Sequence, residues 1–208
     1  MRFDQDLDGL VWDGRQEIPE VKSWPFRISM EEMTLAEASR CWQEQGMMLA
    51  PAHVVYNMLK SVAGEISRSE TVPWELDKAL AAGIITDTAV EYSESSKIAV
   101  VRHGYSLGTH YEVVMPFRPC SPNRNGVNNL KLLKEILLTN DSRGSIENTL
   151  NMVSKCKKTI FYLSIFSENR MKPVSIGYSS IENAVYFGTN LSSLNGKGCS
   201  IGVDKNGL

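Results

Sequence analysis

The sequence predicts an α+β protein: N-terminal helices and a β-hairpin, then two more helices and a C-terminal antiparallel β-meander. Three observations lead to this prediction. Apolar residues recur at helical spacing between positions 34 and 82. Runs of β-branched and aromatic residues flank positions 104–108 and fill most of the C-terminal third. The turns in that third are too short for the crossovers that a parallel sheet needs.

The order of these elements divides the chain into four parts. Residues 1–30 form an irregular N-terminal arm, and residues 31–118 form a helical unit with a β-hairpin. Residues 119–126 are a linker rich in turn-forming residues, and residues 127–208 form a second α+β unit. Because the second unit is small for an independent core, we expect it to dock on the first unit or on another subunit.

Three helices are expected in the first unit. Thr34 and Glu37 form a capping box for a helix over residues 34–45, and Gly46 can supply the left-handed residue after its last turn. A proline favours the start of the second helix, over residues 51–67, and its apolar residues form one continuous stripe. A third, shorter helix is expected over residues 73–82, and a glycine follows it.

The remaining elements are two further helices and the strands. One helix is expected over residues 129–138, and Ser145 caps the next. Residues 97–103 and 109–115 are the two arms of the hairpin. The strands of the meander are expected at residues 158–166, 173–179, 184–188 and 199–203.

Charge is unevenly distributed along the chain. Residues 1–118 carry 11 basic and 18 acidic side chains, a net charge of −7. Residues 119–208 carry 11 basic and 6 acidic side chains, a net charge of +5. An acidic unit joined to a basic one is expected to attract another copy of itself or an anionic partner.

The N-terminal arm carries large apolar side chains. Trp12, Trp24 and Phe26 are costly to leave in water, at about 25 cal/mol per Å² of apolar surface. We therefore expect the arm to lie over the body of the protein or over a neighbouring subunit, with these residues at the contact.

Composition argues against several classes of protein. No apolar run approaches the roughly 20 residues needed to span a bilayer, and the acidic N-terminus is unlike a secretory signal. The four cysteines form no Cys-x-x-Cys pair, so we expect free thiols rather than a zinc ribbon. The expectation is a soluble, cytoplasmic protein with no membrane partner.

No cofactor is indicated beyond one candidate for Ca²⁺. Asp4, Asp6 and Asp8, followed by Gly9, resemble the opening of an EF-hand loop, which implies a Ca²⁺ site. The twelfth position of such a loop is a bidentate Glu, and Arg15 stands there instead, so a solvated acidic terminus is the alternative. Within this stretch, Asp6-Leu7-Asp8-Gly9 resembles the nucleophile motif of haloacid-dehalogenase-type phosphatases, whose buried strand before the first Asp is missing here.

A second short motif lies at the predicted hairpin. Arg102-His103-Gly104 resembles the signature of the histidine phosphatase family. This resemblance implies that His103 accepts a phosphoryl group and that Arg102 binds the phosphate. The family's second, distant His has no counterpart after His110. Alternatively, His103, His110 and Glu112 bind a metal or shuttle protons, or they are ordinary hairpin residues.

A cluster of basic residues is the candidate nucleic-acid site. Cations contact phosphates, and aromatic residues of a sheet stack on bases, so a basic run followed by an aromatic strand favours this function. The candidate residues are Arg124, Lys155, Lys157, Lys158, Arg170 and Lys172.

No complete catalytic set is present in the sequence. We therefore expect a non-enzymatic binding or assembly protein, such as a component of a virion or of another complex. It would self-associate or dock on a protein partner through the arm and the complementary charged units. Two alternatives stay open: a nucleic-acid-binding accessory protein, and a phosphatase-like or metal-dependent enzyme centred on His103.

Overall fold

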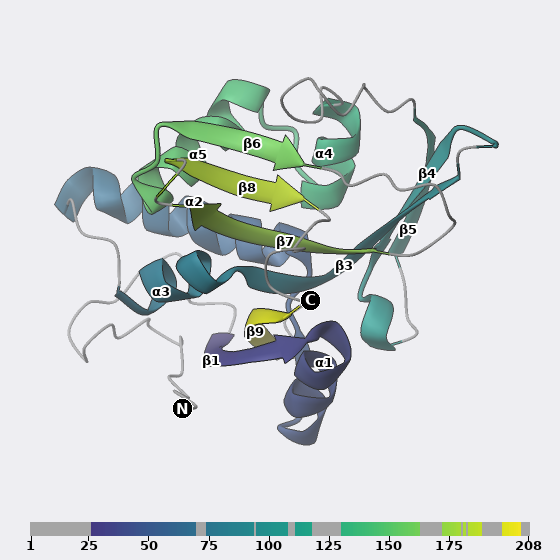
Figure 1. Cartoon of the computed structure of the whole chain (residues 1–208), viewed down its shortest axis with the longest axis horizontal. Helices are drawn as coiled ribbons and strands as arrows, with labels where there is room; N and C mark the ends of the chain where they lie inside the picture. The colour runs from purple at the N-terminus through teal and green to yellow at the C-terminus, as the bar shows by residue number, and fades with distance from the viewer. Residues whose placement is uncertain are drawn as a thin grey trace.

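The computed structural model describes residues 26–69, 74–93, 95–107, 111–117, 130–162, 172–179, 181, 183–188 and 197–204. These residues form an α+β fold, as predicted, with helices packed on a mixed β-sheet (Figure 1). The α-helices are α1 (Leu35–Glu44), α2 (Ala52–Ser69), α3 (Trp74–Ala82), α4 (Leu130–Leu137) and α5 (Arg143–Ser154). The strands are β1 (Phe26–Thr34), β2 (Met47–Leu49), β3 (Ile84–Ser93), β4 (Ile98–His103), β5 (Tyr111–Pro116), β6 (Lys158–Tyr162), β7 (Lys172–Ser179), β8 (Ala184–Gly188) and β9 (Lys197–Asp204). The short 3₁₀-helix η2 (Tyr105–Leu107) follows β4 and precedes β5 in the chain.

The sheet combines strands from both halves of the sequence. Its main order is β1-β9-β3-β7-β8-β6, and β2 also pairs with β9. The second half of β3 continues into an antiparallel ribbon with β4 and β5, which extends from the body in Figure 1. Because β3 pairs directly with both β7 and β9, the two charged units expected from the sequence share one sheet.

The predicted C-terminal meander is wrong in two places. β7 and β8 are an antiparallel hairpin, as expected. However, β6 pairs with β8 in parallel, and β9 leaves this group to pair with β1 and β3. The chain between β6 and β8 includes β7, so it is long enough for the crossover that parallel pairing requires.

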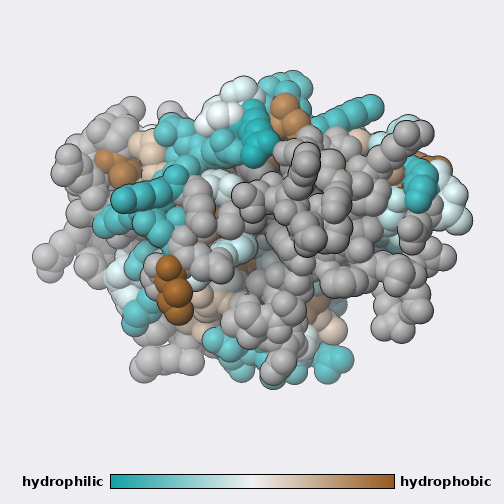
Figure 2. All heavy atoms as spheres, turned by 45° about the horizontal axis from the view of Figure 1, so that its top comes forward, coloured by the Kyte–Doolittle hydropathy of each residue, from teal (hydrophilic) through white to brown (hydrophobic). Residues whose placement is uncertain are grey.

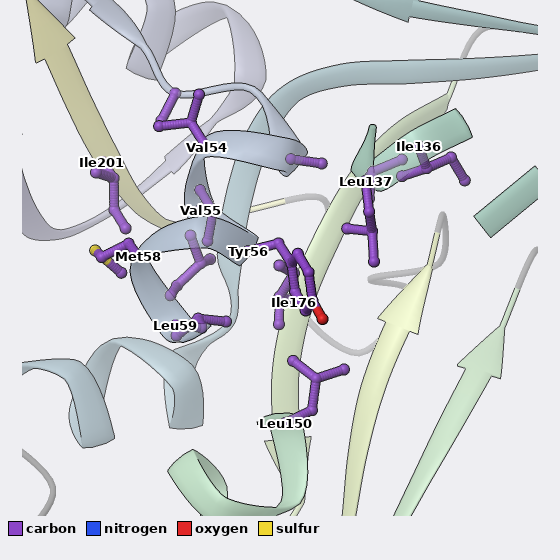
Figure 3. Packing of buried hydrophobic residues seen from close by; sticks show 14 of the residues in the cluster. Val54, Val55, Tyr56, Met58, Leu59, Ile136, Leu137, Leu150, Ile176 and Ile201 are labelled. Atoms are coloured by element: carbon purple, nitrogen blue, oxygen red, sulfur yellow. The ribbon is translucent and has the colours of Figure 1, made fainter. Parts of the chain in front are cut away.

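Helix α2 is the centre of the main hydrophobic core. Figure 3 shows its side chains among those of Ile201 of β9, Ile176 of β7, Ile136 and Leu137 of α4 and Leu150 of α5. Tyr56 is fully buried, and its hydroxyl donates a hydrogen bond of 2.9 Å to Asp141. Burial is the main cause that raises the pKa of Tyr56, and the hydrogen bond from Lys60 lowers the pKa of Asp141.

Strand β9 is buried on both faces. Cys199, Ile201 and Val203 face the main core. Ser200 and Gly202 point the other way, toward Trp42 of α1, whose indole N–H donates to the Ser200 hydroxyl at 3.0 Å. A second cluster of buried side chains surrounds Trp42: Met33, Ala38, Cys41, Met47 and Leu49.

Of the helix caps predicted from the sequence, those of α1 are confirmed and that of α5 is wrong. The capping box of Thr34 and Glu37 is formed, and Gly46 has the positive φ of 74° expected after α1. Helix α5, however, is capped by Ser142, whose hydroxyl accepts from the Ser145 N–H at 3.1 Å. None of the described helices is long and apolar enough to cross a bilayer.

Candidate functional site

The imidazole of His103 is buried in a network of structural hydrogen bonds. The residue is only 4% exposed. Its Nε2 lies 3.1 Å from the carbonyl oxygen of Glu135, which can only accept, so Nε2 carries the proton. Its Nδ1 lies 3.0 Å from Oγ1 of Thr88, and this oxygen accepts from the Ala52 N–H at 2.9 Å. The network fixes His103 as a neutral imidazole that joins β3, β4, α2 and α4.

His53, in the first turn of α2, packs edge-on against His103. The ring centroids are 5.2 Å apart at an interplanar angle of 81°. Burial, and secondarily the electrostatic interaction with His103, lowers the pKa of His53 to about 4. The pKa of His103 is also lowered, mainly by burial, and the hydrogen bond to Glu135 opposes this shift. Both rings are therefore neutral at physiological pH.

This geometry does not provide the phosphatase site that the motif implies. A phosphoryl acceptor needs an exposed ring nitrogen, and both nitrogens of His103 have structural partners. Arg102 is on the opposite face of β4, because adjacent strand residues alternate. Its guanidinium pairs with Glu112 at 2.6 Å and with Glu91 at 3.5 Å. Arg102 and His103 therefore do not share a pocket.

The other sequence candidates for metal binding are not brought together either. Glu112 is paired with Arg102 in the β-ladder, while His103 is paired with Tyr111, so Glu112 and His103 face opposite sides. His110 and the acidic residues Asp4, Asp6 and Asp8 lie outside the described residues. Within the described ranges no three His, Cys, Asp or Glu side chains are grouped as metal ligands.

The Thr88 hydroxyl is the link on which the histidine network depends. We expect Thr88→Val to lower the free energy of unfolding by about 2 kcal/mol, because it leaves the Ala52 N–H and His103 Nδ1 buried without a partner. Thr88→Ser keeps the hydroxyl and is the matched control, with a loss of about 1 kcal/mol for one methyl group. Urea unfolding of the three proteins measures both values. Equal losses in the two variants would contradict the structural role of the hydroxyl.

The candidate nucleic-acid residues fall at opposite ends of the sheet. Lys155 and Lys157 are exposed where α5 leads into β6, and the Lys157 N–H donates to Asn183. The strand register pairs Lys158 of β6 with Ala184 of β8, and Ala184 in turn with Ser179 of β7. Lys172 is seven residues from Ser179 along β7, about 23 Å away at 3.3 Å per residue. The described members of the set therefore do not gather at one end of the sheet; Arg124 and Arg170 lie outside the described residues.

The residues predicted for an interface are only partly described. Trp12 and Trp24 lie outside the described residues. Phe26 is the first residue of β1, pairs with Val203 and is buried in the main core. The irregular arm predicted for residues 1–30 is therefore wrong for its last five residues, which belong to β1. Phe26 buries its apolar surface within the chain and is only 3% exposed.

The outer face of the ribbon of β3, β4 and β5 carries a group of exposed and half-buried apolar side chains. Met115 of β5 is buried in the core, so its neighbours Val114 and Pro116 point outward. Val114 is 58% exposed and lies opposite Val100 of β4, while Pro116 lies opposite Ile98. These four apolar side chains form a cross-strand patch; we call it the ribbon patch. Beside it lies the ion pair of Arg102 and Glu112.

The ribbon patch was not identified from the sequence. Both hairpin runs carry apolar residues at odd and even positions, which indicates two apolar faces. Only the register shows that one of these faces packs on the core and the other is outermost.

Outside the ribbon patch, the exposed large apolar residues of the described structure are Trp74, Tyr105, Tyr111, Leu138 and Ile181. Figure 2, which brings the side of β6 and α5 forward, shows mainly hydrophilic residues among those described, with small separate apolar areas. Ile181, in the turn between β7 and β8, is 95% exposed and is one isolated side chain. Single exposed apolar residues of this kind are common on protein surfaces. Comparisons with protein-family models, with curated proteins and with solved structures found no match to this chain.

Proposed function

We propose that this chain works by binding and assembly, without an enzymatic step. The observation that carries the proposal is the contrast between the two candidate regions of the ribbon. On its inner face, the groups that could do chemistry are engaged in structural hydrogen bonds around His103. On its outer face, the ribbon patch leaves aliphatic side chains in water, and such surfaces are typical of contacts with other proteins.

The N-terminal arm supplies a second contact in this proposal. The sequence places Trp12 and Trp24 ahead of β1, and the sheet begins at Phe26. Residues 1–25 can therefore be removed without deleting any residue of β1. The charge asymmetry supports a salt-sensitive contact, with the exposed Lys155 and Lys157 as its described cationic part.

The experiment compares the mass of the full chain with that of three variants by light scattering after size exclusion. We expect the full chain to form multimers in low salt and to dissociate in about 0.5 M salt, because exposed charges are screened there. The variant lacking residues 1–25 and the full-length Trp12→Ser, Trp24→Ser variant should both associate more weakly. The Ser variant keeps every charge and separates apolar contact from charge.

The charge contact has its own variant and its own contradiction. Lys155→Glu combined with Lys157→Glu should weaken association in low salt and have little effect in high salt. A full chain that stays monomeric at high concentration in low salt, with truncation affecting only stability, would contradict the proposal. Nucleic acid that co-elutes with the protein and is lost in the Lys variant would favour the nucleic-acid alternative.

A further inference from the structure

The histidine pair lies where the ribbon joins the helices. Thr88, His103 and Tyr111 are opposite one another on β3, β4 and β5, and we call this end of the ribbon the ribbon base. The ring centroid of His103 is 5.2 Å from that of His53 in α2 and 6.0 Å from that of Tyr111. Its nitrogens also bond to Thr88 and to the Glu135 carbonyl of α4. The pair therefore connects the ribbon base with both α2 and α4.

The imidazole of His53 lacks the hydrogen bonds that His103 has. Its Nδ1 is buried and has no hydrogen-bond partner among the described residues. In the neutral ring with its proton on Nε2, Nδ1 is only an unpaired acceptor. In the protonated ring both nitrogens carry a proton, so Nδ1 becomes a buried donor on a cation with no acceptor. Burying an unpaired charged donor is far more costly than burying an unpaired acceptor.

The position of His53 in the fold adds to this cost. The residue is in the first turn of α2, where the aligned peptide dipoles place partial positive charge. The neighbouring ring is a second imidazole, which also gains positive charge if it is protonated. Tyr111, the third ring of the group, carries no negative charge at neutral or acid pH. An imidazolium at position 53 is therefore opposed by each of these neighbours.

The charged residues of the neighbouring elements do not offset this cost. Those of the three ribbon strands are Asp87, Glu91, Arg102 and Glu112, and those of α4 are Lys131, Lys134 and Glu135. The carboxylate of Asp87 accepts two hydrogen bonds from Ser106, and Glu91 and Glu112 both pair with Arg102. Glu135 contacts His103 through its backbone carbonyl, and Lys134 donates to the carbonyl of Asn140. In α2 the charged residues begin at Lys60, about two turns beyond His53.

We propose that His53 and His103 form a pH-sensitive contact, which holds the ribbon base on α2 and α4 when both rings are neutral and releases it when His53 is protonated. Protonated His53 needs water at Nδ1, and water reaches this atom only when the ring separates from His103. Separation of the ribbon base from α2 also parts the Thr88 hydroxyl from the Ala52 N–H. The proposal goes beyond the proposed function and does not depend on it.

The opening is local because of where the contact lies. The ribbon extends from one side of the body in Figure 1, and among the described strands β5 pairs only with β4. Release of the ribbon base breaks the side-chain bonds of Thr88 and His103 to α2 and α4. It leaves the pairing of β9 with β1 and β3 intact, where the Cys199 N–H donates to the Gly83 carbonyl at 2.8 Å. Openings of this kind need less free energy than global unfolding.

Native-state hydrogen exchange of the full-length protein, followed by NMR in low concentrations of urea, tests the proposal. The reporter is the Ala52 amide, which loses its partner when the ribbon base separates from α2. The reference is the Cys199 amide inside the sheet. The protection factor of each amide is its exchange rate corrected for the intrinsic effect of pH, under conditions where reclosing is faster than exchange.

We expect the protection factor of Ala52 to fall about 20-fold between pH 7 and pH 5. In the open state His53 titrates at its ordinary pKa of about 6.5, whereas in the closed state its pKa is about 4, so the open state binds more protons as pH falls and gains population by about this factor. Exchange of Ala52 should depend only weakly on urea, because a local opening exposes little surface. Exchange of Cys199 should depend on urea steeply.

Two results would overturn the proposal. His53→Gln keeps a polar side chain that does not titrate, so its Ala52 protection should differ little between pH 7 and pH 5; a fall as large as in the wild-type protein would exclude His53 as the sensor. In the wild-type protein alone, an Ala52 amide as sensitive to urea as Cys199 at both pH values would show that it exchanges only through global unfolding. Neither result depends on self-association, which is measured separately.

Discussion

Replacing Gly202 by alanine is expected to lower the free energy of unfolding by about 3 kcal/mol, the upper part of the range for overpacked cores. A Cβ at this position would collide with the indole ring of Trp42. The ring cannot move aside easily, because it is 1% exposed and its N–H donates to Ser200. The close approach of α1 to β9 is therefore possible only because residue 202 has no side chain. Urea unfolding measures the loss.

The chain offers a matched control for this substitution. Gly64 lies in α2, and a Cβ built there meets no atom within 4 Å. Gly64→Ala should therefore stabilise the protein by about 0.5–1 kcal/mol, through the lower backbone entropy of alanine in a helix. Gly202→Ala and Gly64→Ala make the same chemical change with opposite expected signs. Destabilisation of similar size at both positions would contradict the packing of Trp42 against β9.

Acid is expected to destabilise the fold through the histidine pair. In the unfolded chain a histidine binds a proton below a pKa of about 6.5, whereas folded His53 does so only below about 4. The unfolded state therefore binds more protons in this window, and the free energy of unfolding falls as pH falls. For His53 alone the expected loss is about 2 kcal/mol between pH 7 and pH 5, and about 3 kcal/mol in total. His103 shifts in the same direction.

The His53→Gln variant isolates this effect. Carboxylates such as Asp141, whose pKa is lowered, affect stability only at more acidic pH, so the window from pH 7 to pH 5 reports mainly on histidine. We expect the wild-type protein to lose about 2 kcal/mol more than His53→Gln across this window. Parallel stability curves for the two proteins would show that His53 titrates normally in the folded state.

Local sequence signals predicted the helices better than the strands. The capping box at Thr34 and the glycine at position 46 use interactions within a few residues, and both are formed. The pairing of β6 with β8 and of β9 with β3 depends on contacts far apart in sequence, which period and turn length do not specify. β3 was not predicted as a strand at all, because it is buried along most of its length and lacks the alternation of a half-exposed strand.

The candidate sites show the same limit. His103 and Arg102 are neighbours in sequence, but a strand sends them to opposite faces, where each has a structural partner. Lys158 and Lys172 are 14 positions apart, yet the register of β6, β8 and β7 sets them at opposite ends of the sheet. Conversely, the ribbon patch joins residues from two strands, so no local motif reports it.

The measurement that tests the central claim most directly is the mass of the unmodified full chain by sedimentation equilibrium, over a series of protein concentrations in low and in high salt. The account predicts a mass that rises with protein concentration in low salt and returns to that of the 23.2 kDa monomer in high salt. A monomer mass at every concentration and in both salts would contradict the claim that this chain works by assembling with itself.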